Sequence, residues 1–196
     1  MDSLAQQARQ TLTLLLQLAY SGELGAARAY AGHRASLSRR DERAALYRIL
    51  RDELHHRHVL LAMLRGLGSG PDARRERKLN AVGRIISTFC FIGGWFAPMY
   101  GAGQLEAQNI GEYELAARLA HLAGLDELVE DLLVLAEVEW DHERVFRAYA
   151  ERHWLWRLFP KWKAPPPREQ IRATYAAFLK DPPGHVAPLR IPFLVR

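Results

Sequence analysis

The sequence predicts an all-α protein, built as a four-helix bundle with one long crossover connection. Residues 1–67 and 110–158 are poor in glycine and proline, and they repeat apolar residues at helical spacing without the alternation of strands. With 196 residues, 49% of them hydrophobic, the chain can bury one compact core. Short links are expected within the first and second pairs of helices and a longer link between the pairs, which gives the crossover.

Start and stop signals set the bounds of the first two helices. The first helix is expected over residues 3–36, with Ser3 as its N-cap. The second is expected to begin at position 38 or 41 and to end at the glycine-rich breaker over residues 66–71. A tight turn therefore joins two antiparallel helices.

The second pair follows the same plan. The third helix is expected to begin in the basic stretch 74–78 and to continue, with some interruption, to about residue 123. Gly124 separates it from a fourth helix over residues 126–152. Another tight turn therefore joins the last two helices of the bundle.

The C-terminal part of the chain has a different composition. It is basic and proline-rich after position 159, and a short helix is expected over residues 169–179. We therefore predict a bundle over residues 1–152 and an accessory segment with C-terminal helices over residues 153–196.

Two Glu-x-x-His tetrads stand out among the polar residues. They pair Glu53 with His56 and Glu139 with His142. Residues three apart share one face of a helix, so each tetrad aims a carboxylate and an imidazole at one point. The tetrads lie on the second and fourth predicted helices, which carry this motif in di-iron carboxylate bundles.

An isolated glutamate on each of the other two helices completes the pattern. Glu23 lies among apolar residues of the first helix, and Glu106 is the first charge after a long neutral stretch; a tyrosine follows each by seven residues, Tyr30 and Tyr113. Glu112 competes with Glu106 if the helical register slips after the glycines, and the tyrosine spacing favours Glu106. An uncompensated buried carboxylate is costly, so these acids need a partner.

These residues together predict a metal centre. Carboxylates can bridge two ions, and imidazole adds a neutral ligand to each. Four glutamates balance the charge of two Fe(II) ions, so we expect two iron ions; manganese or a mixed manganese and iron pair uses the same donors. The expected ligands are Glu23, Glu53, His56, Glu106, Glu139 and His142.

At these residues the sequence resembles the demethoxyubiquinone hydroxylases, ferritin-like di-iron proteins of ubiquinone biosynthesis. The resemblance covers residues 12–150 and rests on the segment 21–32 (Ser-Gly-Glu-Leu-Gly-Ala-Ala-Arg-Ala-Tyr-Ala-Gly), on the stretch 93–106 and on both tetrads. It implies a ferritin-like bundle whose six ligands hold two irons that activate dioxygen to hydroxylate a quinone ring. Ala107 stands where the family usually has a second acid.

A charge-free stretch over residues 85–105 raises the question of a membrane. Its glycines and Pro98 argue against a full span, and two interpretations remain. The stretch is either buried in the bundle or rests in a lipid interface, where Phe91, Trp95, Phe96 and Tyr100 would form an aromatic belt together with the aromatic and basic segment 154–163. We expect interfacial attachment.

The small residues Gly101, Ala102 and Gly103 lie just before Glu106. They leave room beside the helix that larger side chains would fill. The room either admits an apolar substrate to the metal or lets two helices pack closely.

The expected function is a di-iron monooxygenase, an oxidoreductase that acts on an apolar, quinone-type substrate at the membrane surface. Its partners are dioxygen, this small molecule, an anionic membrane surface that suits the net charge of +5, and an external electron donor, because the sequence has no nucleotide-binding motif. No zinc-finger or RNP-like pattern indicates nucleic acid. The alternative is a ferritin-like iron-binding oxidase or peroxide-scavenging protein without a lipidic substrate. The oligomeric state stays open, with a homo-oligomer among the alternatives.

The expected location is cytoplasmic and peripheral, on the inner face of the membrane. The N-terminus has an acid at Asp2 and no basic region ahead of its first apolar run, unlike a signal peptide. The chain has one cysteine, Cys90, which excludes an internal disulfide and fits a reducing compartment.

Overall fold

The computed structural model describes residues 2–186, and this part of the chain contains helices and no strand. The prediction of an all-α bundle is therefore confirmed. Two single-turn 3-10 helices, Asp126–Leu128 and Trp154–Arg157, accompany the six α-helices. The α-helices are α1 (Asp2–Ser36), α2 (Arg40–Gly66), α3 (Ala73–Phe89), α4 (Phe96–Leu122), α5 (Val129–Glu151) and α6 (Glu169–Phe178).

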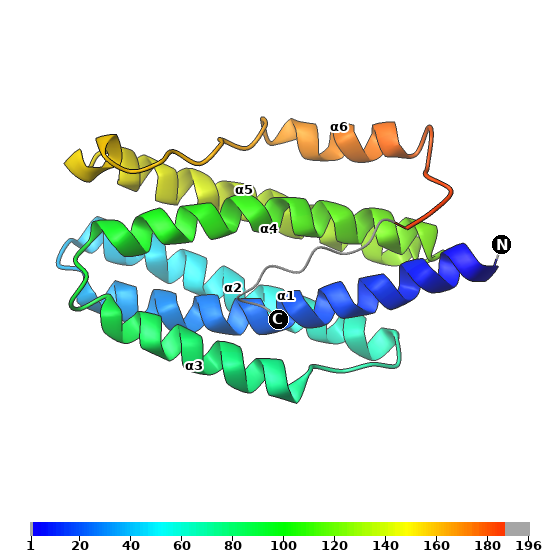
Figure 1. Ribbon diagram of the computed structural model, residues 1–196, viewed down its shortest axis with the longest axis horizontal. Coiled ribbons are helices and arrows are strands. Elements are labelled where there is room, and N and C mark those ends of the chain that lie inside the picture. The colour runs from blue at the N-terminus through cyan, green and yellow to red at the C-terminus, as the bar shows by residue number, and fades with distance from the viewer. Residues whose placement is uncertain (1, 187–196) are drawn as a thin grey trace.

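Helices α1, α2, α4 and α5 form the bundle (Figure 1). Helix α1 packs against α2 and α4, and α5 packs against α2 and α4. The partners α1 and α2 are antiparallel, as are α4 and α5, whereas α2 and α4 run in the same direction (Figure 1). The chain must therefore travel back along the bundle between α2 and α4, as the predicted crossover requires.

The predicted third helix is wrong in one respect, because residues 74–123 form two helices. Helix α3 is the return path and lies along the outside of α1, and α4 is the bundle helix (Figure 1). The chain reverses between them at a turn where Gly94 has a φ of 74°, a conformation that glycine adopts without strain. Helical periodicity alone does not show such a reversal.

The starts of the helices differ slightly from expectation. Helix α1 begins at Asp2, so Ser3 lies within the helix and the expected N-cap is wrong. The N-cap of α3 is Asp72, whose carboxylate accepts hydrogen bonds from the backbone amides of Arg74 and Arg75 at 2.8 and 3.1 Å. This cap fixes where the return helix starts.

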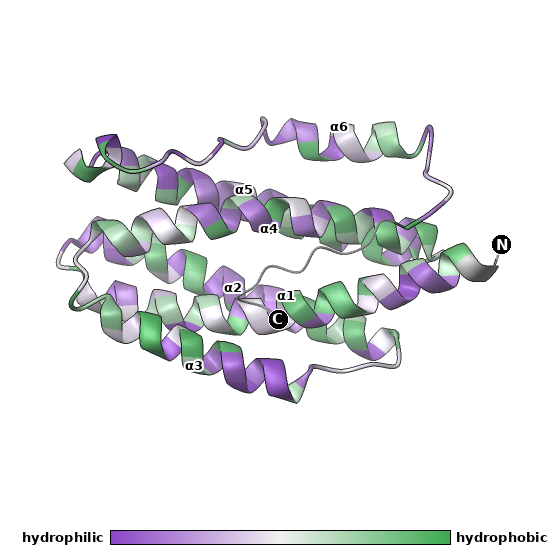
Figure 2. Cartoon of the chain, in the orientation of Figure 1, coloured by the Kyte–Doolittle hydropathy of each residue, from purple (hydrophilic) through white to green (hydrophobic). Residues whose placement is uncertain are grey.

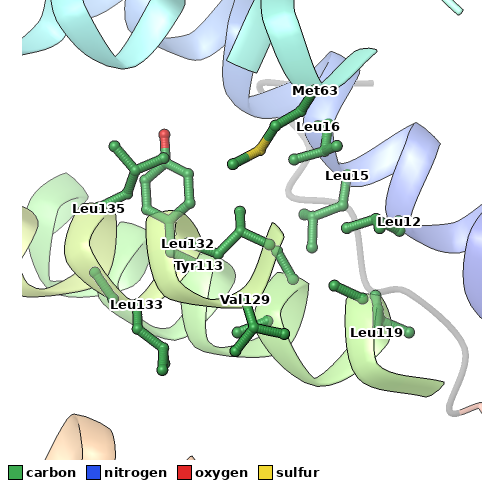
Figure 3. Packing of buried hydrophobic residues seen from close by; sticks show 14 of the residues in the cluster. Leu12, Leu15, Leu16, Met63, Tyr113, Leu119, Val129, Leu132, Leu133 and Leu135 are labelled. Atoms are coloured by element: carbon green, nitrogen blue, oxygen red, sulfur yellow. The ribbon is translucent and has the colours of Figure 1, made fainter. Parts of the chain in front are cut away.

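Two apolar layers fill the bundle. The larger layer joins the N-terminal half of α1 to the C-terminal half of α4 and the start of α5, and Figure 3 shows its leucines packed around Met63 and Tyr113. The smaller layer lies toward the other end of the bundle and contains Tyr30, Met99 and Phe146. The residues of each helix that lie between these layers are buried and polar, which places a charged layer in the middle of the core.

The residues after α5 form a strap that folds back over α4 and α5. The indole of Trp162 donates a hydrogen bond to Glu143 (2.8 Å), and the indole of Trp140 on α5 donates one to the carbonyl oxygen of Pro166 (2.8 Å). Helix α6 continues the strap, and Arg172 pairs there with Glu137. Residues 187–196 of the expected accessory segment lie outside the described residues.

The expected aromatic belt is only partly exposed. Phe96 is buried against Trp156, Ala150 and the strap, and Tyr100 stacks edge-on against Trp162. Phe91 is 62% exposed. The prediction of a lipid-facing belt is therefore wrong for Phe96, because the strap supplies apolar partners that the sequence does not reveal.

The room beside Gly103 is filled by the strap. A Cβ atom added there would lie 2.6 Å from the Trp162 ring and 3.2 Å from the Cβ of Phe146. A Cβ added at Gly101 would meet nothing within 4 Å. The small residue at position 103 thus serves close packing.

This difference predicts opposite effects for two matched substitutions. Gly103→Ala should lower the free energy of unfolding by about 1–2 kcal/mol, because the hydrogen-bonded Trp162 ring must move. Gly101→Ala should raise it by roughly 0.5–1 kcal/mol, because alanine favours an open helical position. Urea unfolding of both variants measures the difference, and equal stability of the two would contradict the packing role of Gly103.

Candidate metal centre

All six predicted side chains meet in the charged layer between the two apolar layers. Each comes from the middle of its helix, Glu23 from α1 and Glu106 from α4, with one tetrad each from α2 and α5. All six are 0–3% exposed. The sequence motifs therefore identified residues that the fold brings together.

The donor atoms form two overlapping groups, in each of which they lie within 4.8 Å of one another. The first group is Glu23, Glu53, His56 and Glu139. The second group is Glu53, Glu106, Glu139 and His142. Glu53 and Glu139 belong to both groups, so these two carboxylates connect the two groups.

The contacts inside the cluster suit metal ligands better than hydrogen bonds. Nδ1 of His56 lies 3.0 Å from Oε1 of Glu139, and Nδ1 of His142 lies 3.3 Å from Oε1 of Glu53. Donor atoms at right angles around one first-row ion, each about 2.1 Å from it, are about 3 Å apart. The separations therefore fit atoms that share an ion.

Several inward-facing atoms have no hydrogen-bond partner among the described residues. They are Glu23 Oε2, both carboxylate oxygens of Glu53, His56 Nδ1, Glu139 Oε1 and His142 Nδ1. Leaving a buried polar atom unsatisfied costs roughly 1–3 kcal/mol, and more for a charged one. Residues that present so many unsatisfied donor atoms to one point fit a bound metal.

The two tyrosines of the repeat connect the halves of the bundle. Tyr30 on α1 donates a hydrogen bond to Oε1 of Glu106 on α4, and Tyr113 on α4 donates one to Oε1 of Glu23 on α1. Each half thus holds the isolated glutamate of the other half. Equal spacing along the chain indicated that the tyrosines matter, and their exchange of partners emerges only in the fold.

Two further polar residues contact the cluster and were missed from the sequence. Asp52 Oδ2 lies 3.2 Å from Nε2 of His142, and the Asn109 amide donates to Oε2 of Glu106 at 3.1 Å. Asn109 is three residues after Glu106, a spacing that puts both on one helical face and could have signalled the contact. Asp52 has no such signal, because its partner is on another helix.

Charges in the cluster shift the protonation of its members. Burial raises the pKa of Glu53 well above its usual range, and the neighbouring Glu23 charge adds to the effect. Burial alone would lower the pKa of His56, but the nearby carboxylates of Glu139 and Glu23 outweigh it and raise the pKa to about 10. Protons therefore compensate part of the negative charge when no metal does so.

The competitors of the predicted ligands lie at the edge of the cluster or away from it. Glu112 is absent from both groups of donor atoms, while Glu106 is in the second group. Burial, with the charges of Glu23 and Glu139, raises the pKa of Glu112 to about 7, so this carboxyl lies near the cluster without joining it. His55 and His58 are exposed on α2. The geometry therefore favours Glu106 on α4.

The side chains of the cluster are placed where they could hold a metal ion. Comparisons with models of known protein families, with curated proteins and with solved structures find no match. Function must therefore be argued from the arrangement of these side chains.

Proposed function

We propose that the protein is a di-iron monooxygenase that hydroxylates an apolar, quinone-type substrate, as its resemblance to the demethoxyubiquinone hydroxylases implies. The observation that carries this proposal is the pair of overlapping donor groups that share Glu53 and Glu139. Two carboxylates placed between two ions, with one histidine for each, match the ligand set of oxygen-activating di-iron bundles. Two irons in this site would supply the electrons and the coordination positions for the activation of dioxygen.

The residues around the site would control the environment of the reaction. The apolar layers above and below the cluster exclude water, which strengthens electrostatic interactions inside it. Tyr30 and Tyr113 hold one oxygen of Glu106 and of Glu23, which restricts how these carboxylates turn toward an ion. Reducing equivalents would come from an external donor.

Attachment to an anionic membrane is supported by the outer face of α3 and the turn after it. Ile85, Phe89, Phe91 and Ile92 are 55–78% exposed, and Trp154, soon after α5, is 68% exposed. The C-terminal ends of α3 and α5 lie at the same end of the bundle (Figure 1). Figure 2 shows α3 changing from hydrophilic to hydrophobic toward this end. An exposed apolar cluster of this kind marks an interaction surface.

Among residues 2–186, no helix combines the length and the apolar character needed to cross a membrane. The proposed attachment is therefore interfacial. It would bring a water-insoluble substrate to the protein and uses the apolar residues of the α3 end and the basic charge of the chain.

The second candidate is a ferritin-like iron oxidase or peroxide-scavenging protein without a lipidic substrate. One observation favours it, because Trp162 fills the room beside Gly103 that a substrate passage would need. Such a protein would use the same six ligands. The two candidates therefore differ in the substrate and agree on the metal.

Loading the metal-free protein with Fe(II) under anaerobic conditions tests the proposal. We expect about two irons per chain. On exposure to air the iron-loaded protein should then consume dioxygen, and a short-chain quinone or phenol in anionic vesicles should raise the rate of this consumption severalfold. Vesicles without this additive are the control. Iron-dependent dioxygen or peroxide consumption that no aromatic additive changes would favour the second candidate, and protein that binds no iron would contradict both.

A further inference from the structure

The two donor groups are supported unequally by the residues around them. Glu106 of the second group accepts hydrogen bonds on both carboxylate oxygens, from Tyr30 and from Asn109. Glu23 of the first group accepts one from Tyr113, and its Oε2 has no partner among the described residues. The second group thus has the more firmly held terminal carboxylate.

The histidines show the same imbalance. His142 faces the cluster with Nδ1 and lies 3.2 Å from Asp52 with Nε2. An imidazole that binds metal through Nδ1 carries its proton on Nε2, so His142 would donate this proton to the Asp52 carboxylate. No hydrogen bond joins Nε2 of His56 to any residue in the described part of the chain. Only one of the two imidazoles is therefore fixed by a carboxylate.

The internal repeat shows why the support is one-sided. The repeat places Glu23 and Tyr30 opposite Glu106 and Tyr113, an offset that puts Ala26 at the position of Asn109. It likewise places Glu53 and His56 opposite Glu139 and His142, and this puts Val138 at the position of Asp52. Both polar supports of the second group are thus replaced by apolar residues in the first group.

We infer that Asp52 and Asn109 are positioning residues that make the two metal positions unequal, so that the position of Glu106 and His142 fills first and holds its ion more tightly. The inference rests on the proposed di-metal site. A carboxylate behind a ligating histidine fixes the orientation and tautomer of the ring and makes it a stronger base. Asn109 restricts Glu106 in the same manner, so less ordering is required when an ion binds.

The position of Glu23 and His56 is then the exchangeable one. Its isolated glutamate keeps an oxygen free of hydrogen bonds, and its histidine is not fixed from behind. A weaker second step permits a different divalent ion to occupy this position after the first is filled. Mixed metal occupancy would follow from the surroundings of the ligands, because each group contains three carboxylates and one imidazole and the two groups do not differ in donor type.

Anaerobic titration of the metal-free full chain with Co(II) tests the inference. Calorimetry and the visible d–d absorption of bound Co(II) report the two steps separately. Wild type should bind two ions in two resolved steps. Asp52→Asn should weaken the first step by roughly 10–100-fold and change the absorption of the first ion, since loss of an outer-shell partner has effects of this size.

Three matched variants complete the experiment. Asp52→Glu should bind the first ion more tightly than Asp52→Asn does, because it restores a carboxylate. Val138→Asp should tighten the second step by supplying the missing carboxylate behind His56. Asp131→Asn, which alters an exposed acid of α5, should leave both steps unchanged. Asp52 is 48% exposed, so its isosteric replacement by asparagine preserves packing, which circular dichroism in chelator verifies.

The outcomes separate this inference from the proposed function. If the wild type binds in two steps and the affinities of both steps are the same in Asp52→Asn and in Asn109→Ala, the inference is overturned. The proposed metal centre would still stand. A wild type that binds two ions with equal affinity would also overturn it. A wild type that binds no Co(II), Mn(II) or Fe(II) would overturn the proposed function itself.

Discussion

Protein carrying Glu139→Ala should bind neither metal ion tightly, whereas protein carrying Glu23→Ala should keep one. Glu139 is a member of both donor groups, and Glu23 is a member of the first group alone. Removing a shared carboxylate takes one of four ligands from each ion. It also leaves only three negatively charged glutamates to neutralise the two ions. We expect the metal content after gel filtration to fall from about two ions per chain to less than about 0.3 in Glu139→Ala.

The same reasoning orders the other variants. Glu53→Ala should behave like Glu139→Ala, and Glu106→Ala should retain one ion, as Glu23→Ala does. Glu127→Ala, at an exposed position before α5, is the control and should retain both ions. Elemental analysis together with far-ultraviolet circular dichroism measures the metal and the helicity. A folded Glu139→Ala protein with two bound ions would show that this carboxylate is not a ligand.

Removing the metal should reverse the dependence of stability on pH. In the metal-free protein, burial alone would lower the pKa of both cluster histidines. The neighbouring carboxylates outweigh burial and raise both pKa values to about 10: Glu139 and Glu23 act on His56, and Asp52 and Glu139 act on His142. The unfolded value is about 6.5, so the folded state holds more protons than the unfolded state between these limits.

The sign of the effect follows. The stabilisation by protonated His56 and His142 is fully present below about pH 6.5, and it is lost as the pH rises toward 10. The raised pKa values of Glu53 and Glu106 act in the same direction. The free energy of unfolding of the metal-free protein should therefore fall between pH 6.5 and 8.5, by up to about 1.4 kcal/mol per pH unit for each histidine.

The metal-loaded protein should not show this fall. Metal ions displace the protons of the histidines, so apparent affinity rises with pH and the bound ions stabilise the fold more strongly. Urea unfolding at pH 6.5 and 8.5, with chelator or with Mn(II), measures both slopes. His55→Gln and His58→Gln, at exposed positions of α2, should keep the wild-type slopes. A metal-free protein that becomes more stable as the pH rises would contradict the protonated cluster.

The residues that meet in the candidate site could be predicted because their signals are local. A tetrad such as Glu53–His56 depends only on the helical repeat, and Glu23 is conspicuous because it is an acid among apolar neighbours. The helix pairs, the turns between them and the buried depth of all six side chains followed from the same patterns.

The parts that could not be predicted depend on contacts between distant segments. Phe96 is as apolar as any lipid-facing residue, and only the return of the strap buries it. The room at Gly103 was visible in the sequence, but its occupant, Trp162, is 59 positions away. Asp52 gains its partner on α5 from the packing of two helices. Helical periodicity in the sequence indicates which face of a helix is buried. It does not indicate which other segment of the chain packs against that face.

The return path along α3 has a consequence for how the chain folds. Because α3 carries the chain back between α2 and α4, α1 with α2 and α4 with α5 are two helical hairpins, each made from contacts close in sequence. Local contacts of this kind form early, whereas docking of the hairpins must close a long loop. Each donor group takes three ligands from one hairpin and one from the other, Glu139 for the first group and Glu53 for the second. Bound ions would thus cross-link the two hairpins and slow their separation. The metal would therefore lower the unfolding rate of the bundle in addition to supplying its chemistry.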